Sequence, residues 1–283
     1  MYEDILLPTD GSEGALAAVR RGLALARVFG ARVHLVSVVD TGVEPAADQT
    51  EGRDRWVASR RQAIAEGRQR AVDADVPVES AVLEGTPYRA LIEYAEERGI
   101  DLVVMGTRGA SDGGQPDLGS TTQRVITVAS VPVLAVPREH DSPADSYDHV
   151  VIATDGSDES ERASTHALTL AERYGADVHV IYVIDSTIFD FEDAPRSVVG
   201  LLKEGGQRAV DDIAATARDR SLPVTTSILR GRPAWAIEAY AAGVDADLIA
   251  LGTRGRAALS DELLGSTTER LVRSSARPVL TVS

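Results

Sequence analysis

The chain has 283 residues, of which 43% are hydrophobic, and this length and composition predict two domains with apolar cores. It carries 44 acidic and 29 basic residues, a net charge of −15, which argues against a general role in binding nucleic acid. Cysteine is absent, which excludes disulfides, thiolate metal sites and cysteine nucleophiles.

The acidic surface has two interpretations. Adaptation to high salt, where bulk ions screen self-repulsion, is the one we favour; a GC-rich genome combined with ordinary acidic solubility is the alternative. The first residues, MYEDILLPTDGS, lack the basic start and apolar core of a signal peptide. Apolar runs stay well below the roughly 18 residues of a membrane span, so we expect a cytoplasmic protein without a membrane partner.

An internal repeat organises the chain. ILLPTDGSEGA (5–15) parallels VIATDGSDES (151–160), and EGTPYRALIEYA (84–95) matches RGRPAWAIEAYA (230–241). The offset is 145 residues early in the repeat and 146 later. We therefore predict a first domain over 1–138, a polar linker over 139–147 and a second domain over 148–283.

Within each half, strand patterns alternate with helix patterns. Ser12 is placed to cap the first helix and Gly30 to end it, while Pro87 and Gly99 bracket a later helix. In chain order, the first half predicts a strand at 5–8, a helix at 12–29, a strand at 33–39, a polar helix at 52–74, strands at 78–83 and 102–105 around a helix at 88–98, a helix at 121–129 and a strand at 131–136.

Near-continuous apolar strands separated by helices indicate a parallel sheet covered on both faces. The predicted fold class is therefore α/β: two tandem α/β sandwiches, each a five-stranded parallel sheet with helices on both faces. In such folds ligands bind at the carboxyl ends of the strands, near the point where the strand order reverses.

Two loops in each half leave strand ends with unusual residues. One is Thr-Asp-Gly-Ser, at residues 9–12 and again at 154–157. The other, here called the glycine frame, is Gly-x2-G-x9-Gly-Ser; its members are Gly106, Gly109, Gly119 and Ser120, and then Gly252, Gly255, Gly265 and Ser266. Glycines let backbone amides approach an anion closely, so both frames are candidate phosphate sites.

Each frame ends at an expected helix start. Ser120 with Gln123, and Ser266 with Glu269, have the spacing of a capping box, and a helix N-terminus attracts phosphate. A capping box alone is more often structural. A P-loop is excluded because the only lysine, Lys203, lies outside both frames, and a Rossmann G-x-G-x-x-G does not follow the first strand.

Both halves resemble universal stress protein (Usp) domains, and the whole chain resembles the tandem members of that family's ATP-binding branch. The resemblance implies an adenine-nucleotide alpha hydrolase-like fold that binds ATP, ADP or AMP, with Mg²⁺ held weakly by Asp10 and Asp155 through the nucleotide. The site residues it implies in the first half are Pro8, Thr9, Asp10, Val38, Met105, Gly106, Arg108, Gly109, Gly119, Ser120 and Thr121. Those it implies in the second half are Ala153, Thr154, Asp155, Val183, Leu251, Gly252, Arg254, Gly255, Gly265, Ser266 and Thr267.

The function that follows from the resemblance is a nucleotide-binding sensor or regulator in the stress response. A slow ATP-hydrolysing or adenylyl-transferring enzyme is one alternative. The sequence offers it no general base pair or cationic clamp beyond Asp10, Asp155 and the loop arginines, so at most a weak ATPase is expected. A partner-binding regulator with vestigial nucleotide sites is the other. The family also implies an intramolecular pseudo-dimer through the last strand of each half, with a homodimer left open.

Other residues carry weaker signals. His34 and His179 occupy matching positions and are interpreted as structural, and Trp56 and Trp235 as packing residues. The residues between the glycines differ: the first span is acidic and glycine-rich, and the second is more helix-like. If only one half binds nucleotide tightly, this contrast favours the second, so that Gly265→Val would cost more binding than Gly119→Val.

Overall fold

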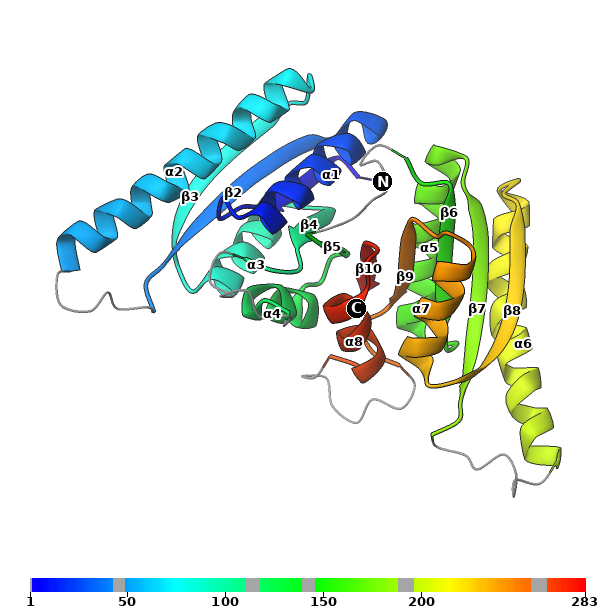
Figure 1. Cartoon of the computed structure of the whole chain (residues 1–283). Helices are drawn as coiled ribbons and strands as arrows, with labels where there is room; N and C mark the ends of the chain where they lie inside the picture. The colour runs from blue at the N-terminus through cyan, green and yellow to red at the C-terminus, as the bar shows by residue number, and fades with distance from the viewer. Residues whose placement is uncertain (1, 43–48, 110–117, 139–145, 188–195, 256–263) are drawn as a thin grey trace. The chain divides into compact units, whose positions relative to one another are not determined.

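The structure is a computed structural model, and it describes residues 2–42, 49–109, 118–138, 146–187, 196–255 and 264–283 (Figure 1). The side chains of 49–53 and 196–199 are not described. The chain divides into two compact units, Met1–Asp145 and Ser146–Ser283, here called the first and second half. Nothing in the described ranges forms a helix both long enough and apolar enough to cross a bilayer.

Strands and helices alternate strictly along each half. In the first half the elements are β1 (Asp4–Pro8), α1 (Glu13–Phe29), β2 (Arg32–Asp40), α2 (Gln49–Asp73), β3 (Val78–Gly85), α3 (Pro87–Arg98), β4 (Leu102–Gly106), α4 (Ser120–Val128) and β5 (Val133–Val136). In the second half they are β6 (His149–Thr154), α5 (Asp158–Tyr174), β7 (Asp177–Asp185), α6 (Arg196–Asp219), β8 (Val224–Gly231), α7 (Pro233–Gly243), β9 (Leu248–Gly252), α8 (Ser266–Ser274) and β10 (Val279–Val282).

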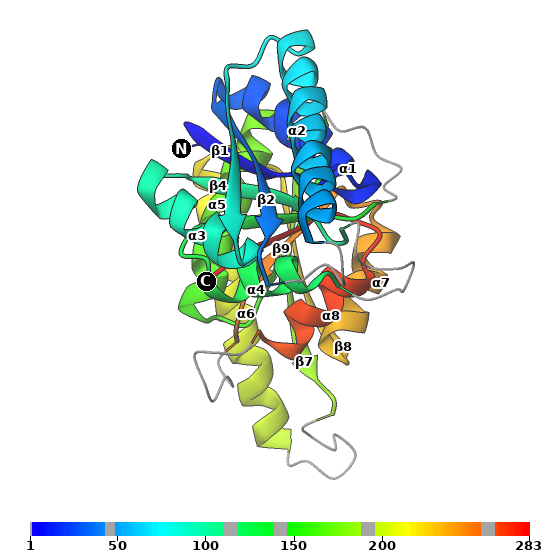
Figure 2. The same ribbon diagram turned by 90° about the vertical axis from the view of Figure 1, so that its left-hand side faces the viewer.

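Each half contains a parallel sheet, in the order β3-β2-β1-β4-β5 in the first and β8-β7-β6-β9-β10 in the second. In the first half α1 and α2 cover one face and α3 and α4 the other. Figure 2 shows α2 running along β2 and β3. The predicted α/β class is confirmed. The strand order reverses between β1 and β4, so their carboxyl ends flank the expected binding position.

Local sequence explains where the helices begin and end. The Ser12 hydroxyl accepts a hydrogen bond from the Ala15 amide at 3.2 Å, as predicted for a cap. Gly30 ends α1 in the left-handed region with φ 68°, a conformation that glycine adopts without strain. Pro87 begins α3, and Gly99 (φ 62°) ends it, so these two predictions are also confirmed.

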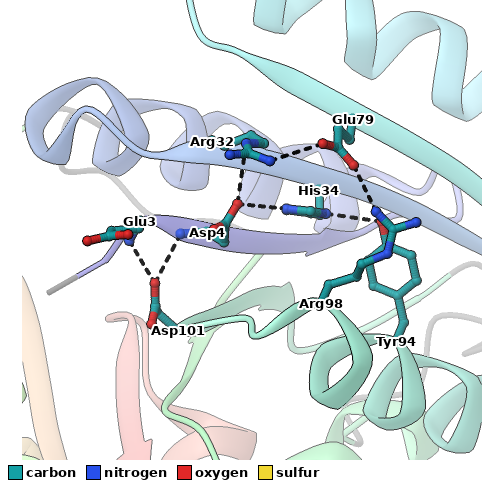
Figure 3. A network of polar contacts seen from close by, with 8 residues as sticks. All are labelled: Glu3, Asp4, Arg32, His34, Glu79, Tyr94, Arg98 and Asp101. Atoms are coloured by element: carbon teal, nitrogen blue, oxygen red, sulfur yellow. Dashed lines mark hydrogen bonds and ion pairs between the residues drawn. The ribbon is translucent and has the colours of Figure 1, made fainter.

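A polar network joins the amino ends of the strands in the first half, at the edge of the sheet opposite the glycine frame (Figure 3). His34 is 2% exposed, and its ring contacts the carboxylate of Asp4 at 2.9 Å and the hydroxyl of Tyr94 at 3.0 Å. The Asp101 carboxylate accepts the backbone amides of Glu3 and Asp4. The buried imidazole of His34 therefore has a carboxylate and a phenol as hydrogen-bond partners.

The salt bridges of the same network lie nearer to solvent. Arg32 contacts Glu79 at 3.1 Å, and Arg98 contacts the other oxygen of Glu79 at 2.9 Å (Figure 3). These two bonds connect the start of β2 to β3 and to the end of α3. Since all three side chains are about half exposed, they contribute little to stability individually.

The second half replaces the carboxylate of this network with a second imidazole. His149 stands where the first half has Asp4, and its ring centroid lies 5.6 Å from that of His179. His179 Nδ1 contacts the hydroxyl of Tyr240 at 3.3 Å. Among the described atoms, His179 Nε2 and His149 Nδ1 are buried without a hydrogen-bond partner. Burial lowers the pKa of His179, and the neighbouring His149 lowers it further, while Asp177 acts in the opposite direction.

Candidate functional site

The turn after β1 fixes the first predicted carboxylate. The Thr9 amide donates to the carbonyl of Val36 at 2.8 Å, which extends the sheet pairing by one residue. Gly11 has φ 82°, and this turn allows Asp10 Oδ1 to accept the Ser12 amide at 2.9 Å. The Asp10 carboxylate is therefore held at the carboxyl end of β1, beside the switch point.

The first glycine of the frame is required by the packing of the protein itself, and the second lies against a side chain that can shift. A Cβ on Gly106 would lie 2.6 Å from the carbonyl oxygen of Gly14 in α1. A Cβ on Gly109 would lie 2.8 Å from Asp10 Oδ2. Neither glycine has a positive φ, so the requirement is for space rather than for an unusual backbone conformation. The sequence-based interpretation, which assigned the glycines to ligand contact, did not include this packing role.

The third glycine of the frame, Gly119, holds the start of α4 against the carboxyl end of β4. The Gly119 amide donates to the carbonyl of Thr107 at 2.9 Å, and the Thr122 hydroxyl donates to the carbonyl of Gly106 at 2.8 Å. These two bonds tie the first turn of α4 to the end of β4. The free amides of that turn therefore face the residues that follow β1 and β4.

The predicted capping box at this helix is wrong. Gly119 is the N-cap, without a side-chain hydrogen bond, and Ser120 is already the first helical residue. The same holds in the second half, where Gly265 caps α8 ahead of Ser266. The long-range bond from the Gly119 amide to Thr107 fixes the helix start one residue earlier than the local pattern indicates. The first-turn amides are thus not satisfied by a cap from Ser120.

These loops enclose a cavity of about 310 Å³ in the first half. All eleven residues predicted for this half line it: Pro8, Thr9, Asp10, Val38, Met105, Gly106, Arg108, Gly109, Gly119, Ser120 and Thr121. Val36, Val38 and Leu91 give it an apolar side, whereas Asp10, Arg108 and the start of α4 make the other side polar. Its volume falls at the lower end of the range for small-molecule sites.

The second half repeats the same framework of bonds. Asp155 Oδ1 accepts the Ser157 amide at 3.0 Å, and a Cβ on Gly255 would lie 2.5 Å from Asp155 Oδ2. The Gly265 amide donates to the Thr253 carbonyl at 2.9 Å, and the Thr268 hydroxyl to the Gly252 carbonyl at 2.8 Å. The loop geometry predicted from the repeat is therefore present twice.

The cavities described in the second half lie elsewhere. One, of about 650 Å³, lies between α5 and α6, and the other is near Lys203 and Ile228. Within residues 146–187, 196–255 and 264–283, Thr154 is the one predicted site residue that lines either of these two cavities. The others, which line neither, are Ala153, Asp155, Val183, Leu251, Gly252, Arg254, Gly255, Gly265, Ser266 and Thr267.

Comparison with known proteins identifies the repeat. The family model of the universal stress protein (Usp) family matches residues 1–137 and again residues 146–283. The chain belongs to the universal stress protein family. The universal stress protein MJ0531 of Methanocaldococcus jannaschii is 39% identical over 48% of this chain and 82% of its own length. A universal stress protein of Mycolicibacterium smegmatis is 28% identical over 98% of this chain and 96% of its own.

The fold comparison agrees with the family match. A universal stress protein from Archaeoglobus fulgidus, solved by crystallography, has a TM-score of 0.76 and 25% identity. The match covers 99% of this chain and 96% of that one. The tandem arrangement of two universal stress protein repeats predicted from the sequence is therefore confirmed.

Sequence reasoning missed several residues that line the first-half cavity, namely Ala15, Val36, Asp40, Trp56, Arg60, Pro87, Leu91 and Thr122. Trp56 and Arg60, both on α2, line the first-half cavity, and Arg60 Nη1 donates to the carbonyl of Asp10 at 2.7 Å. Trp56 and Trp235, interpreted as packing residues, are 38% and 60% exposed, so neither belongs to an apolar core. Trp235 instead lies 5.6 Å from the guanidinium of Arg270.

A metal site made by protein ligands alone is not present in the described residues, where no cluster of three or more His, Asp or Glu side chains could hold an ion. Asp10 and Asp155 each supply a single carboxylate that is already hydrogen-bonded to the following turn. Mg²⁺ typically binds one or two carboxylates together with substrate phosphates and waters. The residues therefore fit a cation that arrives with a phosphate ligand.

Proposed function

We propose that this chain binds ATP, with Mg²⁺, at the carboxyl ends of β1 and β4 and serves as a sensing or regulatory module in the stress response. One observation carries the proposal: eleven residues chosen from the sequence of the first half all line a single cavity at the switch point. Such convergence is unexpected for loops whose only role is to connect strands and helices.

The apolar side of the cavity suits an adenine base. Val36 and Val38 follow each other along β2 with one residue between them, so their side chains lie on the same face of the sheet. Leu91 of α3 and Met105 of β4 extend this surface. A flat aromatic ring would bury apolar area against these four side chains, which is the main source of affinity in small-molecule sites.

The polar side of the cavity suits the phosphates. The amides at the start of α4, together with the hydroxyls of Ser120 and Thr121, would donate to phosphate oxygens at the positive end of the helix dipole. Arg108 adds a cation to the same side. Asp10 would contact the ribose hydroxyls or the Mg²⁺ that neutralises the phosphates, which balances its own negative charge.

The test is thermal unfolding of the whole chain with and without saturating ATP and Mg²⁺, at low and at high salt. A ligand that binds the native state must stabilise it, by about 2.7 kcal/mol at a concentration of 100 Kd. Inorganic triphosphate with Mg²⁺ is the matched control for binding by charge alone. Equal melting temperatures with and without ATP at every salt concentration would overturn the proposal. Mass spectrometry of nucleotide released from freshly purified protein would identify the bound form.

A further inference from the structure

Helix α2 contributes two side chains to the first-half cavity. Trp56 and Arg60 are four residues apart, so they lie on the same side of the helix, one turn from each other. Both line the cavity that also contains Asp10, Val38 and Asp40. Neither residue belongs to the glycine frame or to the Thr-Asp-Gly-Ser turn.

Arg60 connects α2 to the turn that holds Asp10. Its Nη1 donates to the Asp10 carbonyl at 2.7 Å, and the methyl group of Ala63, one turn further along α2, would lie 3.3 Å from a Cβ on Gly11. A guanidinium has five N–H donors, and this bond uses one of them. Trp56, at 38% exposure, presents part of its indole at the same cavity. Indole faces stack readily on nucleobases.

The second half lacks both groups. Residues 146 positions later on α6 are Leu202 and Gly206. A Cβ on Gly206 would lie 2.7 Å from the ring of Tyr182, so that ring fills the space beside the helix. Tyr182 stands at the strand position that Ser37 occupies in the first half. At corresponding positions, the first half therefore has a small Ser37 and a large Arg60, and the second half has a large Tyr182 and a glycine.

We infer that Trp56 is a ligand-binding residue and Arg60 a positioning residue of the first half, and that the first half holds adenine nucleotide more tightly than the second. The inference rests on the proposed function, because it concerns the same ligand. It also reverses the expectation drawn from the loop sequences, whose residues 110–117 and 256–263 lie outside the described residues. Asp10 and Asp40 both line the first-half cavity, so a cation from α2 beside Arg108 offsets their repulsion of phosphates.

The two tryptophans make the inference measurable, since each half contains one. In Trp235→Phe the remaining emission comes from Trp56, and in Trp56→Phe it comes from Trp235. Titration of the full-length chain with ATP and Mg²⁺ should quench Trp56 to saturation. Trp235 should respond weakly, or only at concentrations about tenfold higher, a difference of about 1.4 kcal/mol in binding free energy.

Arg60→Ala tests the positioning role, with Arg61→Ala as the matched control, because Arg61 is the exposed neighbour on the same helix and carries the same charge. Calorimetry should show affinity for ATP about tenfold lower in Arg60→Ala and within about twofold of wild type in Arg61→Ala. Arg60→Lys keeps the positive charge but not the planar guanidinium with its fixed N–H donors, so it should recover only part of the lost affinity for ATP. Circular dichroism without nucleotide verifies that each variant is folded.

The outcomes separate this inference from the proposed function. If ATP binds by calorimetry, while Trp56 emission stays constant and the two arginine variants bind equally, the inference is overturned and the proposed function stands. If calorimetry detects no ATP binding to the wild-type chain, both are overturned. Tighter binding reported by Trp235 than by Trp56 would restore the expectation that favours the second half.

Discussion

The two halves of this chain share a loop framework and differ in the helix that follows the second strand, α2 in the first half and α6 in the second. In both halves the aspartate of the Thr-Asp-Gly-Ser turn accepts the amide of the serine, and the first two glycines of the frame lie against other protein atoms. The amides of Gly119 and Gly265 also make the same backbone bond. Yet the first half has Ser37 and Arg60 where the second has Tyr182 and Gly206. The loop framework is thus maintained by its own internal packing, while these two differences between the halves lie outside the recognisable motif.

This comparison separates two reasons for a glycine in a binding loop. A glycine that prevents a clash with protein is needed whether or not ligand binds, as at Gly106 against α1. A glycine that admits a ligand is needed only where a ligand exists. The signature motif is complete in both halves, and its first glycine is needed for packing in each, so the motif alone does not distinguish the two halves.

The largest effect is expected from Gly106→Ala. Its methyl group would approach the Gly14 carbonyl to 2.6 Å, and relieving that overlap should lower the free energy of unfolding by about 3 kcal/mol. Gly252→Ala, whose Cβ would lie 2.7 Å from that of Glu159, should behave alike in the second half. Urea unfolding without nucleotide is the measurement. Gly205→Ala in α6 is the control, since its Cβ meets nothing within 4 Å, and should be neutral or slightly stabilising.

The residues that differ on β2 and α2 predict a specific coupling. Ser37 is buried, so Ser37→Tyr alone overpacks the space beside α2 and should lower the unfolding free energy by about 2 kcal/mol. Adding Arg60→Gly copies the second half and should recover about 1 kcal/mol of that loss. The control is Ser37→Tyr with Arg61→Gly, in which glycine lowers helix stability to the same extent but removes an exposed side chain and so makes no room for the tyrosine ring. Equal stability of the two double variants would contradict the coupling.

The histidine pair predicts that the stability of the second half depends on pH. The folded-state pKa of His179 is lowered, so the unfolded chain binds more protons than the native state once the pH falls through about 6.5. The free energy of unfolding should therefore decrease below that pH. His149→Asp restores the carboxylate that Asp4 provides beside His34 and should weaken or reverse the slope.

Denaturant unfolding between about pH 5 and pH 8, monitored by the fluorescence of Trp235 in a Trp56→Phe background, measures the second half. His149→Asn is the control, because it removes the neighbouring imidazole without adding a charge. A wild-type slope that is unchanged in His149→Asp would show that other groups cause the acid sensitivity.

The smallest effect concerns Trp235 and Arg270. Their contact at 5.6 Å is exposed, so Trp235→Ala should lower the unfolding free energy by only about 0.5 kcal/mol. Trp235→Phe keeps an aromatic face over Arg270 and should retain most of the contact. A double-mutant cycle with Arg270→Ala measures the coupling, and a coupling of zero would mean that the two side chains merely lie adjacent.

The fold was predictable because its signals are local and repeated. Short apolar strands, the Ser12 cap and the Gly30 stop can each be recognised within one turn or strand. That the eleven residues chosen in the first half lie close together was predictable, because the family signature marks strand ends that a parallel sheet brings together. Their convergence on one cavity is consistent with the strand order that the structure has.

What could not be predicted depends on contacts between distant segments. The start of α4 shifts by one residue because Gly119 bonds to Thr107, which no local pattern encodes. Arg60 reaches Asp10 across 50 positions of sequence, from a helix with little apolar periodicity. The expected pairing of the last strands between the halves is likewise a question of long-range contact and stays a prediction.

The strand order within each half also constrains how the chain is made. β1 is a central strand whose second neighbour is β4, and Ile5 pairs with Leu102. During synthesis the first strand thus emerges from the ribosome long before it can be flanked on both sides. Until then, its apolar residues Ile5, Leu6 and Leu7, all fully buried in the folded chain, have one partner strand at most. The nascent first half is therefore most exposed to aggregation and chaperone binding before β4 is complete.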